Sequence, residues 1–431
     1  MVIDLGLERE PPVQRLRDWG RRPKRWRPLA LALVAALLLA VTGSGPAPAP
    51  RLALNASLPL DRHTDFVVLG DRLYVSTADP EPDRSPAEHR WRLSAYELPG
   101  GRPLWTAPYA SSVEQFVDVQ HADGMVLVTG LVSGDGIATP TTAVEAATGR
   151  PLWTLPARVA VADDRRTGLV SGWTRPGEPP GPAVRAVDLA TGRDLWKADF
   201  SQAATVRPVP NGLALVVIGG DAGGRAEVRD VRTGAVRASR DVPTPASGPA
   251  IAVSVGDSLL LGYQDGGGAR GIAAYAAETL ELRWRRTITE DDVRRFGPCG
   301  SLVCTPGIGG VQAIDAVTGE LVWQTRGVEL VVDVGGILVA DGLVAIDPES
   351  GRTLFGLETL QTGLSPRPEH GLVSVGRAVG EERSWLSIAR PHTAAPRPLG
   401  AVPVRVTDCA AGERSVVCRV PTDRLSIWTY R

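Results

Sequence analysis

The phrase AVDLATGRDLW (Ala186–Trp196) recurs along this chain and decides its fold. Close copies are AVEAATGRPLW (Ala143–Trp153) and AIDAVTGELVW (Ala313–Trp323). Fainter copies are AYELPGGRPLW (Ala95–Trp105), VRDVRTGAVRA (Val228–Ala238), AYAAETLELRW (Ala274–Trp284) and AIDPESGRTLF (Ala345–Phe355). Copies that repeat in register along a chain indicate a protein built from structural repeats.

Each copy has the pattern of a β-hairpin. Alternating residues predict one strand, and a Thr-Gly turn then leads into a second strand. The turn needs a residue with positive φ, and we expect Gly149, Gly192 and Gly319 to supply it. The carboxylates of Asp188, Asp315 and Asp347 precede the turns, where they can accept hydrogen bonds from turn amides.

The second strand of the phrase ends in an aromatic residue. Five of the eleven tryptophans occupy this one offset, and a phenylalanine occupies it once: Trp105, Trp153, Trp196, Trp284, Trp323 and Phe355. A large flat side chain placed so regularly buries much area between neighbouring repeats. We therefore predict that these residues dock one repeat against the next.

The spacing of the anchors distinguishes between repeat architectures. Neighbouring anchors lie between 32 and 48 residues apart, and the interval from Trp196 to Trp284 holds two units with Ala238 at the middle anchor. A period of roughly 40–45 residues with four strands per unit is typical of β-propellers. Helical solenoids of similar period need apolar stripes of helical spacing, which are nearly absent. The predicted fold is an all-β propeller of four-stranded blades.

At these residues the chain resembles the pyrroloquinoline-quinone-type propeller repeat family, over roughly Leu52–Arg431. That repeat builds quinoprotein alcohol dehydrogenases, an outer-membrane-assembly lipoprotein and many exported propellers. The resemblance implies a fold and not a reaction, because the repeat is a blade-packing unit that also occurs in members without a quinone.

The number of blades is harder to predict from the repeats than the type of fold. A literal count gives eight internal units, the last of them degenerate and running from beyond Phe355 to about Leu399. A further unit has three C-terminal strands, and its missing outer strand could come from Leu52–Leu60. Such closure by both ends of the chain would remove open sheet edges. Eight blades are usual for the family, so we expect eight; seven and nine stay open.

Composition agrees with a large β fold and argues against nucleic-acid binding. The 431 residues include 48 glycines and 36 prolines, as many short turns require, and 43% are hydrophobic. The net charge is −1, whereas nucleic-acid-binding domains carry a basic patch or stripe. We therefore expect no nucleic-acid partner.

The N-terminus forms a separate module in this interpretation. Residues 1–28 are predicted to be a basic cytoplasmic tail, with eight basic and four acidic residues. Leu29–Gly45 contains no charged residue and is predicted to be a transmembrane signal-anchor helix. Residues 46–51 form a Pro/Ala linker, and residues 52–431 form the propeller ectodomain. Because basic flanks stay inside, we expect a single-pass plasma-membrane protein with an extracellular propeller.

A cleaved signal peptide is the alternative. It fits the short apolar core Leu29–Val41 and the small residues at Ala47-Pro48-Ala49, and the propeller would then be secreted. The long basic leader favours the retained anchor, because signal-peptide leaders are usually short.

The four cysteines fit export. Cys299 and Cys304 are separated by four residues, and Cys409 and Cys418 by eight. Both spacings suit disulfides across hairpins that turn at Ser301-Leu302 and Glu413-Arg414. Zinc binding and free core thiols are the rival interpretations. No histidine neighbours either pair, and the two pairs lie far apart in sequence.

No pattern predicts a catalytic, cofactor-binding or metal-binding residue. Resemblance to the quinoprotein dehydrogenases would require an adjacent-cysteine disulfide and a set of calcium ligands, and neither is found. The c-type haem pattern Cys-x-x-Cys-His is absent as well. The histidines occur in no nucleophile or metal motif; His121, two residues before Asp123, is interpreted as a solvated loop residue.

A binding surface remains. Segments longer than turns require occur at Ala78–Arg90, Gly130–Thr141, Gly172–Pro182 and Thr359–His370. The first three fall between second and third strands, so they should gather on one face and could hold an unknown protein or small ligand. The expected function is a non-enzymatic, membrane-anchored scaffold at the cell envelope. The alternative is an envelope enzyme, a quinoprotein-like oxidoreductase or a sugar-active enzyme, with a site in the propeller channel.

Overall fold

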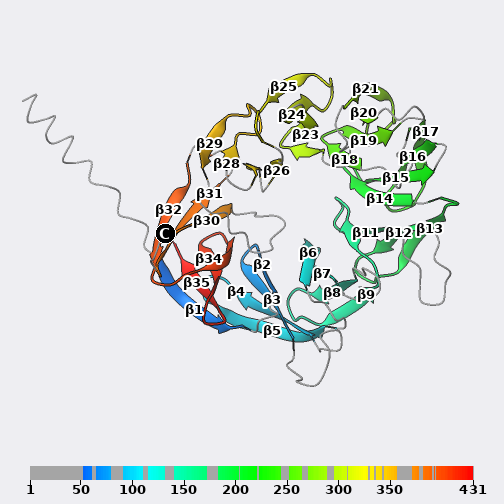
Figure 1. Cartoon of the computed structure of the whole chain (residues 1–431). Coiled ribbons are helices and arrows are strands. Elements are labelled where there is room, and N and C mark those ends of the chain that lie inside the picture. The colour runs from blue at the N-terminus through cyan, green and yellow to red at the C-terminus, as the bar shows by residue number, and fades with distance from the viewer. Residues whose placement is uncertain are drawn as a thin grey trace, which may run out of the picture. The chain divides into compact units, whose positions relative to one another are not determined.

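The computed structural model is all-β over the residues that it describes. These are residues 52–60, 65–78, 91–109, 115–131, 140–171, 183–202, 204–220, 223–243, 252–264, 270–288, 296–307, 309–328, 331–333, 336–341, 344–356, 371–377, 382–390, 393 and 395–430. They form nine separate antiparallel sheets, which are the blades of a propeller (Figure 1).

Seven blades are formed by four strands that follow one another along the chain. Blade 1 has β2 (Asp65–Leu69), β3 (Arg72–Ala78), β4 (Trp91–Glu97) and β5 (Arg102–Tyr109). Blade 2 has β6 (Gln115–Ala122), β7 (Met125–Leu131), β8 (Thr141–Glu145) and β9 (Pro151–Leu155). Blade 3 has β10 (Val159–Val161), β11 (Thr167–Ser171), β12 (Ala183–Asp188) and β13 (Asp194–Asp199). Blade 4 has β14 (Ala204–Val209), β15 (Leu213–Gly220), β16 (Gly223–Asp230) and β17 (Val236–Val242).

The remaining blades follow in the same order. Blade 5 has β18 (Ala252–Val255), β19 (Ser258–Gln264), β20 (Arg270–Ala276) and β21 (Leu282–Thr287). Blade 6 has β22 (Gly297–Cys299), β23 (Leu302–Gly307), β24 (Gly310–Asp315) and β25 (Leu321–Gln324). Blade 7 has β26 (Val331–Asp333), β27 (Leu338–Ala340), β28 (Val344–Ile346) and β29 (Thr353–Gly356). Blade 8 has β30 (Leu372–Arg377), β31 (Ser384–Ala389) and β32 (Arg397–Val402) among the described residues, and blade 9 has β33 (Thr407–Ala411), β34 (Ser415–Val420), β35 (Arg424–Thr429) and β1 (Ala53–Pro59).

The prediction of eight blades is wrong, because the structure has nine. A count of eight would require that one weak unit is not a full blade, but each weak unit forms its own sheet. The copy with Ala238 at its anchor is the outer hairpin of blade 4, and the degenerate unit beyond Phe355 is blade 8. Alternating apolar residues are sufficient to form a blade, since blade 4 buries Leu215 and Val217 without an aromatic anchor.

The predicted closure by both ends of the chain is confirmed. β1 pairs with β35 in antiparallel register from Ala53↔Thr429 to Pro59↔Arg424. Figure 1 shows this first strand, in blue, beside the last strands of the chain, in red. Apolar residues of blade 1, such as Phe66, pack against Val417 and Ile427 of blade 9. The N-terminal strand therefore completes the last blade.

The hydrophobic core is distributed between blades. One cluster joins Val67 and Leu93 of blade 1 to Val119, Val126 and Val128 of blade 2. Each of these side chains is at most 5% exposed. Burial of this kind, at about 25 cal/mol per Å² of apolar surface, is the main force that holds one blade to the next.

Five tryptophans contact the turn of the following blade. Trp153 Nε1 donates to Leu189 O at 2.6 Å, and its ring lies against Gly192. The same arrangement joins Trp105 to Gly149, Trp196 to Gly234, Trp284 to Gly319 and Trp323 to Gly351. Phe355, without a donor, packs against the cluster that contains Ile337 and Leu372.

The turns between third and fourth strands are closed by their aspartates. Asp188 Oδ1 accepts hydrogen bonds from Thr191 N at 2.9 Å and Thr191 Oγ1 at 2.8 Å. Asp315 accepts from Thr318 N at 2.7 Å, and Asp347 from Glu349 N at 3.0 Å. These bonds satisfy turn amides that the strands leave unpaired.

At one blade junction the small residue is at the anchor position and the large residue is at the turn position. At the junction of blades 4 and 5 the anchor is Ala238, and the turn position that is elsewhere glycine is Leu280. Leu280 keeps the left-handed backbone, with φ of 57°, and is 0% exposed. Its side chain packs in the cluster that Ala238 also joins. The gap left by the missing tryptophan is thus filled from the opposite side.

Both predicted disulfides are present. They join Cys299 to Cys304 and Cys409 to Cys418. Cys409 and Cys418 lie directly opposite each other, as expected for the turn at Glu413-Arg414. The turn predicted at Ser301-Leu302 is one residue too late, since Cys299 pairs with Leu302. The turn begins at Gly300, whose φ of 62° favours glycine. Cys299 and Cys304 are therefore not directly opposite each other, and the disulfide joins them diagonally across the hairpin.

The predicted tail, helix and linker, residues 1–51, lie outside the residues described here. Among the described residues there is no helix long and apolar enough to cross a membrane.

Candidate functional site

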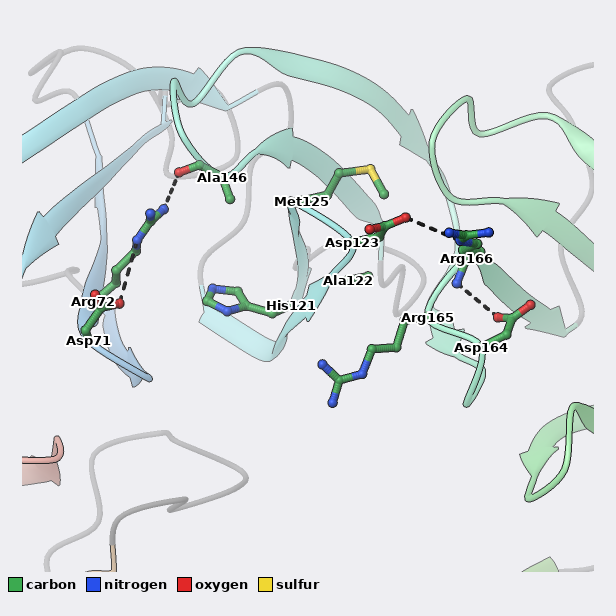
Figure 2. A pocket seen from close by; sticks show the side chains of 11 residues that line it. Asp71, Arg72, His121, Ala122, Asp123, Met125, Ala146, Asp164, Arg165 and Arg166 are labelled. Atoms are coloured by element: carbon green, nitrogen blue, oxygen red, sulfur yellow. Dashed lines mark hydrogen bonds and ion pairs between the residues drawn. The ribbon is translucent and has the colours of Figure 1, made fainter.

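A cavity of about 620 Å³ opens at one end of blades 1, 2 and 3. We call this end the turn face, because it carries the turns β2–β3, β6–β7 and β10–β11 and the turn β8–β9. The opposite end, the loop face, carries the connections between second and third strands. The cavity is lined by Asp71, Arg72, His121, Ala122, Asp123, Gly124, Met125, Ala146, Asp164, Arg165 and Arg166 (Figure 2).

Contacts between blades hold the walls of this cavity. Arg72 of blade 1 donates a hydrogen bond to Ala146 O of blade 2. The Tyr74 hydroxyl lies 2.9 Å from His121 Nε2, again joining blades 1 and 2. Asp123 of blade 2 forms an ion pair with Arg166 of blade 3 at 3.5 Å. These three contacts connect blades 1, 2 and 3 around the cavity.

The contact between Tyr74 and His121 is shielded from water at the tyrosine. The Tyr74 side chain is 0% exposed, and burial raises the pKa of its phenol to about 12. The phenol therefore keeps its proton at neutral pH and remains a hydrogen-bonding group for the imidazole. Its ring also meets His121 edge-on, with ring centroids 5.8 Å apart.

The turn from β10 to β11 is fixed by Asp164. Its carboxylate accepts hydrogen bonds from Arg166 N at 3.0 Å, Thr167 N at 2.9 Å and Thr167 Oγ1 at 2.8 Å. Burial acts to raise the pKa of this carboxyl, but these hydrogen bonds outweigh it, and the pKa of Asp164 lies below its usual range. The Asp164 carboxylate thus makes its hydrogen bonds within its own turn.

Arg165 differs from the other charged residues of the cavity. Its φ is 54°, a left-handed conformation that costs a non-glycine residue about 1–2 kcal/mol. The side chain is exposed, and Figure 2 shows its guanidinium extending away from Asp164 and Arg166. Within the described part of the chain, this guanidinium has neither a hydrogen-bond partner nor an ion-pair partner.

The floor of the cavity is apolar. Ala122 is 1% exposed and Met125 is 6% exposed, and both begin or end strands of the first hairpin of blade 2. Met125 is one of only two methionines in the chain. A thioether is flexible and polarisable, so it adapts to ligands of different shape. The cavity combines an apolar floor with a charged rim, as binding sites do.

The cavity was not predicted from the sequence. Three of the four long segments expected to bind, Ala78–Arg90, Gly130–Thr141 and Gly172–Pro182, connect strands at the loop face and lie almost wholly outside the described residues, as does Thr359–His370. His121 is exposed, as expected of a solvated residue, but the predicted loop position is wrong, because His121 lies in strand β6 and contacts Tyr74 in the neighbouring blade. One signal was available: blade 3 has four charged residues, Asp163–Arg166, where other blades turn with glycine.

Metal coordination finds no support in the described residues. No group of three or more histidine, cysteine, aspartate or glutamate side chains converges there. All four cysteines form disulfides, which removes the thiolates that zinc binding would have needed.

Comparison with protein families identifies the repeat. The family model described as outer membrane protein assembly factor BamB matches residues 89–260 and again 181–363. Together these matches cover more than half of the chain. The chain belongs to this propeller family. No curated protein sequence matches the chain.

Several solved structures align with most of this chain. BamB from Moraxella catarrhalis aligns with 88% of this chain and 98% of its own, at 14% identity and a TM-score of 0.41. A europium-containing methanol dehydrogenase aligns with 78% and 84%, at 15% identity and a TM-score of 0.45. The C-terminal WD40 domain of Sif2 aligns with 89% and 99%, at 9% identity and a TM-score of 0.40. With TM-scores below 0.5, these alignments carry no argument about this chain.

Proposed function

We propose that this protein is a non-enzymatic scaffold of the cell envelope that binds a protein partner at its turn face. The observation that carries the proposal is the cavity at blades 1 to 3, with an apolar floor, a charged rim and walls held by contacts between blades. Contacts that hold the walls in place favour binding, because fewer groups lose conformational freedom when a partner binds. The family description, an assembly factor, accords with a role in binding.

The proposed location rests on the sequence and on the disulfides. Leu29–Gly45 would anchor the chain in the plasma membrane, with residues 1–28 in the cytoplasm and the propeller outside. Cys299–Cys304 and Cys409–Cys418 fit an oxidising compartment, where disulfides persist. Secretion after signal cleavage is the alternative.

Two measurements on whole cells test the location. We expect the intact 45.6 kDa chain in the membrane fraction after carbonate extraction, and we expect external protease to reach the propeller. A mature chain that starts near residue 50 and is recovered in the medium would show cleavage in place of anchoring.

Site-specific photo-crosslinking in intact cells tests the binding role. A photoreactive residue at position 71 reports on the turn face, because the Asp71 side chain is 78% exposed. The matched control is position 195 on β13, where Leu195 is 40% exposed on the outer strand of blade 3. We expect a defined protein adduct from position 71 and none from position 195. Adducts from position 195 alone would place the interface on the outer strands, and no adduct from either position would contradict the scaffold.

A further inference from the structure

We propose that the turn-face cavity recognises a carboxylate on an acidic side chain of the protein partner, and that Arg165 is the residue that binds it. This inference rests on the proposed function and specifies the chemistry of the same site. It follows from the state of each charged group around the cavity, from the backbone of Arg165 and from the lining beneath it.

Most charges of the cavity already have partners, including Asp71, which lies 3.9 Å from the Arg72 guanidinium. Arg72 donates to Ala146 O, and Arg166 pairs with Asp123 at 3.5 Å. Asp164 accepts three hydrogen bonds from its own turn. Arg165 is left with no partner among the described residues, although it lines the same cavity. A guanidinium in that state offers paired donors that match the two oxygens of a carboxylate.

The backbone at Arg165 supports a role for its side chain. At the corresponding turns, blades 2, 5 and 6 place Gly124, Gly256 and Gly300 at positive φ, where glycine costs nothing. Blade 3 places an arginine at φ of 54° instead. The conformation is stabilised by the hydrogen bond from Arg165 N to Ala162 O at 2.9 Å and by the bonds to Asp164. The guanidinium thus extends from a fixed point.

The surroundings favour a carboxylate over a phosphate. Asp71, Asp123 and Asp164 line the cavity together with three arginines, so its formal charge is balanced when His121 is neutral. Because this lining carries no excess positive charge, it does not offset the cost of desolvating a doubly charged phosphate, and a singly charged carboxylate costs less to desolvate. The cavity also has room for the residues that flank an acidic side chain, because about 620 Å³ lies within the range of pockets that hold drug-sized ligands.

The floor provides a specific reporter for binding. Met1 and Met125 are the only methionines in the sequence, so a chain with 13C-methyl-labelled methionine gives at most two methyl signals. Met125 lies in the cavity. The variant M125L loses one signal and so identifies the signal of Met125.

The experiment titrates the labelled chain, in detergent micelles, with three probes. These are the blocked peptide acetyl-Ala-Glu-Ala-amide, the same peptide with glutamine in place of glutamate, and inorganic phosphate. We expect a saturable shift of the Met125 signal with the glutamate peptide alone. R165Q should weaken this binding at least about tenfold, because a charge-assisted bidentate pair is lost.

Two further variants separate recognition from folding. R193Q removes the same charge from an exposed arginine of blade 3 that does not line the cavity, and it should bind like the native chain. R165G suits the left-handed backbone, so it should fold as well as the native chain and still lose binding.

Several outcomes would overturn the assignment. Equal shifts with the glutamate and glutamine peptides, or full binding by R165Q, would show that Arg165 does not recognise the charge. A shift with phosphate alone would assign the site to phosphate. If crosslinking from position 71 captures a partner that R165Q binds as tightly as the native chain, the carboxylate inference fails and the scaffold stands. If no partner is captured although the peptide binds, the proposed function fails and the anion site stands.

Discussion

The indole of Trp153 lies against the α-carbon of Gly192 in the next blade, so closely that a Cβ on Gly192 would come within 2.6 Å of the ring. The same contact recurs at four other blade junctions. The glycine of each repeated turn therefore has two functions: it adopts positive φ, and it leaves room for the tryptophan of the preceding blade.

The variant G192A tests this double requirement. We expect it to lower the free energy of unfolding by about 2–4 kcal/mol, since the methyl group meets Trp153 and the backbone is strained as well. G256A is the matched control, because Gly256 has φ of 56° and nothing within 4 Å of an added Cβ. It should cost only the backbone strain, about 1 kcal/mol. Equal losses in urea denaturation would contradict the role of the tryptophan contact.

The reversed junction at Ala238 and Leu280 is suited to a double-mutant cycle. L280G should destabilise by about 2–3 kcal/mol, because the cavity it leaves outweighs the relief of the left-handed backbone. A238W should clash with Leu280 and destabilise as well. The double variant recreates the Trp–Gly pair, so it should be more stable than the sum of the single losses by at least about 1 kcal/mol. Strict additivity would show that the two positions do not share one space.

Ring closure is tested on β1. Leu58 is half-buried against the cluster that contains Val417 and Ile427, whereas Leu54 on the same strand is 60% exposed. We expect L58D to destabilise the protein by about 2–3 kcal/mol and to promote aggregation through the freed edge of β35. L54D, the control, should change the unfolding free energy by less than about 0.5 kcal/mol. Thermal unfolding and size-exclusion chromatography distinguish the two.

Removal of either disulfide should lower the free energy of unfolding. By the loop-entropy relation, the short loops closed by Cys299–Cys304 and Cys409–Cys418 each correspond to about 2–3 kcal/mol. Each pair of cysteine-to-alanine substitutions should lower the unfolding free energy by about that amount. Non-reducing peptide mapping should recover these two pairings. Free thiols in the unreduced, unfolded protein would contradict them.

Acid should weaken the repeated turns. The hydrogen bond from Thr233 N and the contact with Arg237 lower the pKa of Asp230 to about 2, and turn amides likewise hold the pKa of Asp315 and of Asp347 below their usual range. A folded-state pKa below the unfolded value means that these groups stabilise the fold above about pH 4, and that this contribution is lost as pH falls toward 2. D230N should be less stable at pH 7 and should lose less stability between pH 4 and 2. Parallel pH profiles for both proteins would contradict this origin.

Much of this architecture could be predicted, because it depends on residues that are close together in the sequence. The turn with Asp188 and Gly192 needs residues only a few positions apart, and the anchor Trp196 follows at a fixed offset. Closure by β1 could also be inferred, since the last unit lacked a strand. The blade count was wrong because the number usual for the family was preferred to the literal count of units, which gave eight internal units and one composite unit. Leu280 and Ala238 each make one copy of the phrase look degenerate. The structure explains both substitutions together, because the two side chains pack in one cluster.

The cavity could not be predicted in the same way. Arg72, His121 and Arg165 come from three different blades, and their spacing along the chain contains no pattern that brings them together. Their proximity depends on how neighbouring blades pack, which is a property of the ring. The long segments attracted attention because they exceed what a turn needs, whereas the residues of the cavity belong to turns of nearly minimal length.

The pairing of β1 with β35 also sets the order in which the molecule can be completed. Asn55 hydrogen-bonds Thr429 across a sequence separation of 374 residues, so β1, the first of the described strands along the chain, pairs with the last of them. Blades 1 to 8 can form as the chain emerges, because their described strands are consecutive. The ninth cannot form until translation has reached the final strand. Until then the N-terminal strand is an unpaired edge, and a chain truncated before Arg424 would expose it permanently.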